Sequence, residues 1–94
     1  MEDSEKAKSV IDTLRAAERE PAPVALPALN GLVGLIQGAS ETSLEVEEAR
    51  ASTFMAICEV AKALHRGNPA ERFWQSAIEA AERWRSLAQS QPMP

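Results

Sequence analysis

The sequence predicts an all-α protein: a small helical bundle built on a long antiparallel helical hairpin, with an N-terminal helix and a short glycine-containing helix packed across it. Alanine and glutamate are abundant, and no stretch alternates β-branched or aromatic residues with polar ones, as a strand would. Only about two residues, Gly67 and Asn68, separate two long helical segments, which forces them into a hairpin. The 94 residues make a single domain, 1–94.

The first predicted helix covers about residues 4–19, with Asp3 or Ser4 as its cap. Its apolar residues form a narrow stripe, so this helix should pack on one side only: Ala7, Val10, Ile11, Leu14 and Ala17. A proline-rich connection over 20–27 follows. Its three prolines exclude a helix and favour an extended, polyproline-like chain.

A short second helix is predicted over about 27–37, with Pro27 at its first position and Gly38 as its stop. Gly31 and Gly34 lie inside it, and each costs about 1 kcal/mol relative to alanine. Two internal glycines indicate either close backbone approach to a neighbouring helix or a poorly formed helix.

The two long helices are predicted over about 43–66 and 69–89, with a frayed tail at 90–94. The first of them has Ser43 as its cap, or a capping box of Thr42 and Glu45, and ends at Gly67. Its middle, "TFMAICEVA", is apolar around most of its circumference, which predicts a place at the centre of the bundle. The last helix has Asn68 as its expected cap.

Three of the four aromatic residues lie in the last helix. On a helical wheel, Phe73 and Trp84 share the centre of its apolar face, with Leu87 close by, so all three are predicted to lie in the core. Trp74 is turned by about 100° from Phe73, and it lies with Ile78 on the shoulder of that face. Trp74 and Ile78 therefore either meet the first two helices or bind a partner, and they are candidate protein-binding residues.

Fourteen acidic and ten basic residues give a formal net charge of −4 and a pI near 5.0. Nucleic acid is not the expected partner, because phosphate binding needs a basic patch. Glu41, Glu45 and Glu48 recur at helical spacing and should project to one side. An acidic face of this kind suits a larger protein partner with a basic surface, and these three residues complete the candidate binding site.

The sequence predicts no enzyme, no cofactor and no metal site. His65 and Cys58 are two helical turns apart, roughly 10 Å, which is too far to share a metal ion. The polar start has no signal-peptide pattern, and the longest apolar run, 24–36, is too short and too interrupted to span a bilayer. We therefore expect a soluble, cytoplasmic protein without a membrane partner.

Residues 32–47, "LVGLIQGASETSLEVE", resemble the helix-turn-helix signature. Gly34 is the small residue of the first helix, Gly38 the turn glycine, and Leu44 the apolar residue that follows. The chain departs from the pattern at Glu47, where an apolar residue is wanted. The would-be recognition helix also carries four glutamates before its first base, Arg50, and these would be repelled by DNA phosphates.

The function that the sequence favours is non-catalytic protein binding, as a small acidic adaptor, chaperone, antitoxin or inhibitor of a larger protein. The alternative is a homo-oligomeric structural subunit, such as a homodimer formed through the hairpin. A third interpretation, an acidic helix-turn-helix-like transcriptional regulator, has the charge of its second helix against it. The Ala-rich, acidic composition is typical of small bacterial and phage proteins.

Overall fold

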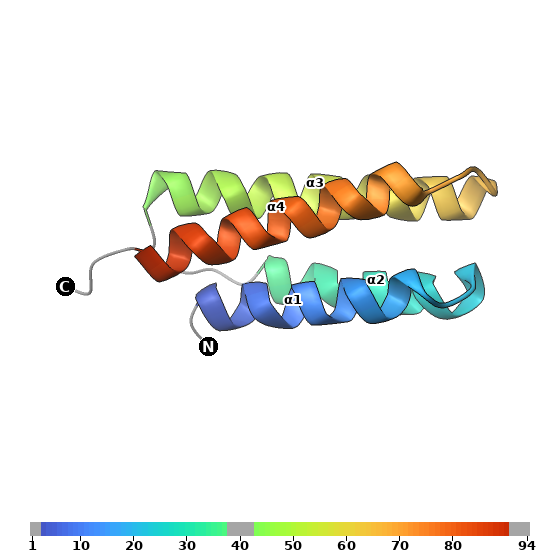
Figure 1. Cartoon of the computed structure of the whole chain (residues 1–94), viewed down its shortest axis with the longest axis horizontal. Helices are drawn as coiled ribbons and strands as arrows, with labels where there is room; N and C mark the ends of the chain where they lie inside the picture. Colours follow the sequence, from blue (N-terminus) through green and yellow to red (C-terminus); the bar gives the residue numbers. More distant parts are fainter. Residues whose placement is uncertain (1–2, 38–42, 91–94) are drawn as a thin grey trace.

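The computed structural model describes residues 3–37 and 43–90. It contains four helices, α1 (Asp3–Glu18), α2 (Ala22–Ile36), α3 (Leu44–Arg66) and α4 (Glu71–Ser90), and no strand among the described residues. The predicted all-α bundle is confirmed. The helices run alternately in opposite directions, in an elongated body of 45 × 20 × 18 Å (Figure 1). Each helix packs on two others, in the cyclic order α1, α2, α3, α4.

The α2 helix corrects the predicted proline-rich connection, because it begins at Ala22 instead of Pro27. Pro21 is the extended residue before the helix, and Pro23 lies in the first turn, where no helical partner is lost. Pro27 is inside the helix and removes the hydrogen bond to the Pro23 carbonyl. Both prolines are exposed, so water can reach that carbonyl. The helix persists because it buries four apolar side chains: Ala25, Leu29, Leu32 and Ile36.

The two glycines of α2 mark neither a close approach of a neighbouring helix nor a poorly formed helix, the two possibilities that the sequence raised. Gly31 and Gly34 are helical and exposed, and a Cβ atom added at either would meet nothing within 4 Å. The helix is therefore well formed, and no neighbouring backbone approaches it at these positions. The predicted stop at Gly38 lies outside the described residues.

The hairpin of α3 and α4 has clearly defined ends. The Ser43 hydroxyl accepts a hydrogen bond from the Val46 amide at 3.3 Å, so Ser43 is the cap; Thr42 of the rival capping box lies outside the described residues. Gly67 ends α3 with φ 71°. Its amide donates to the Leu64 carbonyl, and the Asn68 amide donates to the Ala63 carbonyl at 2.9 Å, which together form a Schellman motif.

Asn68 is not the cap of α4. Its backbone amide completes the end of α3, and α4 begins only at Glu71, two residues later than predicted, where the Trp74 amide donates to the Ala70 carbonyl. The connection therefore covers residues 67–70, which is still short enough to hold the two helices as an antiparallel hairpin.

The buried face of α4 differs from the one predicted. Trp74 is 5% exposed and Trp84 is fully buried, whereas Phe73 is 38% exposed and Leu87 is half-buried. The reason is that α4 packs against both α3 and α1. The buried side of α4 therefore points between these two neighbours. Its residues follow one another at spacings of three, four and three: Trp74, Ala77, Ala81 and Trp84. Phe73 lies at the margin of this stripe, about 60° from its centre, and is 38% exposed, so its predicted place in the core is wrong.

The α3 helix is not at the centre of the bundle, in contrast to the prediction. It contacts α2 and α4 only, and Met55, in its apolar middle, is 67% exposed. Its buried residues follow one face of the helix: Val46, Ala49, Thr53, Ile57, Val60 and Ala63. The Thr53 hydroxyl donates to the Ala49 carbonyl at 2.8 Å, which satisfies the one polar side chain buried on that face.

One buried polar contact joins the start of α1 to the end of α4. The Trp84 indole N–H donates to the Asp3 carboxylate at 3.2 Å, and Asp3 is only 6% exposed. An indole donor in a core needs such an acceptor, since an unpaired buried N–H costs about 1–3 kcal/mol.

We predict opposite effects of one substitution at two kinds of glycine. Gly31→Ala and Gly34→Ala should each raise the free energy of unfolding by about 0.5–1 kcal/mol, because both sites are helical and open. Gly67→Ala should lower it by about 1–2 kcal/mol, because Gly67 has a left-handed φ. Denaturant melts of the three variants measure these changes. A destabilised Gly31→Ala protein would contradict the open α2 face.

The aromatic residues of α4 allow a second prediction. Trp84→Ala should lower the free energy of unfolding by about 3–5 kcal/mol, since it empties a fully buried site. Phe73→Ala should lower it by less than about 1.5 kcal/mol, because Phe73 is partly in solvent. Urea melts compare the two variants, and equal losses would place both rings in the core.

Candidate protein-binding surface

A groove runs along the hairpin between α3 and α4, and we call it the α3–α4 groove. Its volume is about 720 Å³. The first half of α3 supplies one wall, and residues 76–87 of α4 supply the other. The lining residues are Glu45, Glu48, Ala49, Ser52, Ser76, Glu79, Ala80, Arg83 and Leu87.

Helix periodicity explains how these side chains come together. Glu45, Glu48 and Ser52 are spaced by three and four residues along α3, so they follow one edge of that helix. Ser76, Glu79 and Arg83 repeat the spacing along α4. Because the two helices are antiparallel, the two edges face each other across the groove.

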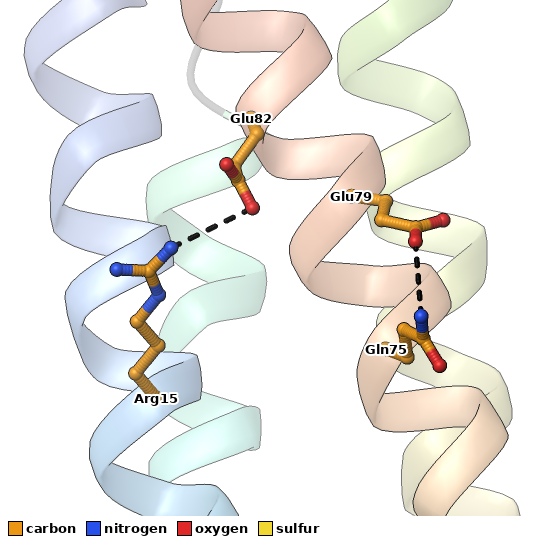
Figure 2. A network of polar contacts seen from close by, with 4 residues as sticks. All are labelled: Arg15, Gln75, Glu79 and Glu82. Carbon is orange, nitrogen blue, oxygen red and sulfur yellow. Dashed lines mark hydrogen bonds and ion pairs between the residues drawn. The ribbon is translucent and has the colours of Figure 1, made fainter.

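The groove is acidic. Glu45, Glu48 and Glu79 are exposed, and none of them forms an ion pair with another described residue. The Glu79 carboxylate accepts a hydrogen bond from the neutral Gln75 amide at 3.2 Å (Figure 2). Among the described residues that line the groove, Arg83 is the one basic residue, so three carboxylates are lined up with one guanidinium.

The opposite edge of α4 faces α1 and is already occupied. Figure 2 shows Glu82 on that side, with its carboxylate 3.6 Å from the Arg15 guanidinium of α1. Both side chains are more than half exposed, so this ion pair contributes at most about 1 kcal/mol. By contrast, the charged side chains on the groove side of α4 form no ion pair with another described helix.

Two large apolar side chains of the hairpin are exposed: Met55 of α3 and Phe73 of α4. Met55 is one turn beyond Ser52 on α3, and Phe73 is one turn before Ser76 on α4. Met55 is 67% exposed and Phe73 is 38% exposed. Neither is among the residues that line the groove.

The residues predicted to bind a partner do not form one site. Glu45 and Glu48 line the groove, as members of an acidic surface. Trp74 is in the core and offers no surface, whereas Ile78 is half-buried on the α1 side of α4, one turn before Glu82. Glu41 lies outside the described residues. Glu79 was missed, because the rotation of α4 about its axis decides which of its residues lie beside α3.

The remaining chemistry-bearing residues are separate from this groove. His65 is exposed, and Cys58 is half-buried without a disulfide partner. Within residues 3–37 and 43–90, no three histidine, cysteine, aspartate or glutamate side chains are grouped so as to hold a metal ion. None of the helices in these ranges has the length and apolar composition needed to cross a membrane.

No known protein family matches this chain, and neither curated proteins nor solved structures include a significant match. The fold and the surface therefore carry the functional interpretation by themselves.

Exposure of the groove carboxylates leads to a stability prediction. Glu45→Gln with Glu48→Gln should change the free energy of unfolding by less than about 1 kcal/mol, mainly through the helix dipole. Ala49→Gln places the same amide at an adjacent buried position and should cost more than about 2 kcal/mol. Thermal or urea melts distinguish the two. If the glutamate pair proved as costly as Ala49→Gln, those carboxylates would belong to the fold and not to a free surface.

Proposed function

We propose that the protein is a non-catalytic protein-binding module that uses the outer face of the α3–α4 hairpin. The observation that carries this proposal is that the hairpin combines an acidic groove with two exposed large apolar side chains, Met55 and Phe73. The chain has only four aromatic residues and buries both tryptophans, yet it leaves Phe73 partly exposed and a methionine largely exposed on this hairpin. Aromatic and methionine side chains are enriched at protein interfaces, where they supply much of the binding energy.

The character of the groove supports binding over catalysis. Its carboxylates are in solvent, whereas general acids and bases work from positions where burial or close neighbours tune them. The role is that of an adaptor, chaperone, antitoxin or inhibitor that occupies part of a larger protein. A cytoplasmic location fits the free Cys58 thiol, since reducing compartments keep thiols unpaired.

A second candidate function, a homo-oligomeric structural subunit, is favoured by a different surface. Residues 21–37 contain no charged residue, and the exposed face of α2 is made of small or neutral side chains. Val24 on this face is 52% exposed. A chain with a net charge of −4 would meet least repulsion when it self-associates through an uncharged face.

The helix-turn-helix interpretation has little support from the fold. Helices α2 and α3 lie alongside each other in opposite directions (Figure 1), whereas the helices of that motif cross at about 90–120°. Of the three interpretations, the transcriptional regulator is therefore the least favoured.

A matched set of variants tests the proposal. Met55→Gln with Phe73→Gln should reduce the recovery of a crosslinked partner from host cells about tenfold, because both apolar contacts are lost. Val24→Gln makes the same kind of change on the far surface and should leave recovery unchanged. Equal recovery with all three proteins would contradict the proposal.

Light scattering on the purified chain separates the two candidate functions. A protein-binding module should have the mass of a monomer, 10.2 kDa. A stable dimer that Val24→Gln dissociates would instead support the homo-oligomeric subunit.

A further inference from the structure

We infer that the outer side of α3 pairs with the same helix of a second copy of this chain, with the two helices antiparallel about a two-fold axis. The contact covers Met55, on which the proposed function draws, yet the inference goes beyond that function and does not depend on it. Two features carry it: an exposed apolar row along α3, and a reversal of charge along the same side of that helix.

The apolar row follows the side of α3 that faces away from the core. Leu44 is 69% exposed and Met55 is 67% exposed. Ala51 lies between them in the sequence and is also exposed. At about 100° per residue, the three side chains fall within roughly 40° of one another. The buried residues of α3, from Val46 to Ala63, lie on the opposite side of the helix, so the described part of the bundle leaves this row in solvent.

The charges beside this row reverse along the helix, with Met55 midway between them. Glu48 lies seven residues before Met55, and Lys62 lies seven residues after it. Glu47 and Arg66 extend the same pattern, and all four charged side chains are exposed. The helix dipole favours acids at the start and bases at the end of any helix. It does not account for the apolar row that lies between them here.

A two-fold axis beside Met55 makes this surface complementary to itself. Antiparallel pairing brings the first turns of one α3 beside the last turns of the other, so Glu47 and Glu48 of each copy meet Lys62 and Arg66 of the other. The two Met55 side chains then meet at the axis. A parallel arrangement would place like charges side by side and is disfavoured.

Lys62 is free to take part in this contact. Its ammonium group lies 3.5 Å from the Glu59 carboxylate, but both side chains are more than half exposed. An exposed pair of this kind is worth little, so exchanging it for Glu48 of the second copy costs little.

The contact is small, which sets its strength. A single pair of helix stripes buries less than the roughly 1,200 Å² of a standard interface, so we expect a dissociation constant on the order of 100 µM. The dilute chain is therefore a monomer with Met55 open to a partner. At high concentration, the two copies cover this residue for each other.

Sedimentation equilibrium from roughly 10 µM to 1 mM tests the pairing. The average mass should rise from 10.2 kDa toward that of a dimer, and added salt should oppose the rise. Met55→Gln should weaken self-association about tenfold, because the two-fold axis makes each copy lose the same apolar contact. Val24→Gln, which changes the exposed face of α2, should have no effect.

Reversing the charges tests the antiparallel arrangement. Glu47→Lys with Glu48→Lys makes both ends of the row basic, and Lys62→Glu with Arg66→Glu makes both ends acidic. Each double variant should be a monomer over the whole range, because its copies now repel each other. A mixture of the two should form a heterodimer, since every opposing pair is again complementary. Circular dichroism verifies that both variants keep their helices.

A matched variant controls for net charge. Glu5→Lys with Glu18→Lys reverses two exposed charges of α1 and gives the same net charge as the reversal at Glu47 and Glu48. It should leave self-association unchanged.

Three results would overturn the inference. The first is a monomer at every concentration, and the second is equal weakening by the reversals on α1 and on α3. The third is a dimer that Val24→Gln dissociates and Met55→Gln does not, which would place the interface on α2. Recovery of a partner from host cells would judge the proposed function separately in the first two cases.

Discussion

The arrangement of the bundle depends on α4, which packs against both α1 and α3. Its buried stripe points between α1 and α3, and Trp84 is fully enclosed there with its indole N–H on the Asp3 carboxylate. This packing determines which aromatic side chains remain exposed to solvent. The two tryptophans fill the space between the helices, and Phe73 is left partly exposed at the margin of the buried stripe. The candidate binding surface is thus a consequence of how the core is filled.

Much of the architecture could be predicted from sequence signals that act locally. Ser43 and Gly67 set the ends of α3 through their own backbone and side-chain chemistry, and a connection as short as 67–70 permits only a hairpin. The errors arose where tertiary packing overrides local preference. Pro27 is tolerated inside α2 because the helix buries apolar residues on its other face, which no local rule reveals.

The candidate site was predicted in part for the same reason. Glu45 and Glu48 follow from helical spacing within α3 alone, and the structure places both in one groove. To predict the positions of Glu79 and Phe73, one would have to know the rotation of α4 about its axis. That rotation depends on contacts with two helices, one of them distant in sequence. A pattern of Trp74, Ala77, Ala81 and Trp84 at 3-4-3 spacing was the available signal, since it is the stripe that places both tryptophans inward.

The hydrogen bond between Asp3 and Trp84 also has a kinetic meaning, because it joins residues 81 positions apart. Closing a chain segment of that length costs more conformational entropy than closing the short connection of the α3–α4 hairpin. The entropy of loop closure therefore favours formation of the hairpin before the contact between α1 and α4. A contact that forms late in folding affects the rate of unfolding more than the rate of folding, so weakening this hydrogen bond would mainly shorten the lifetime of the native state.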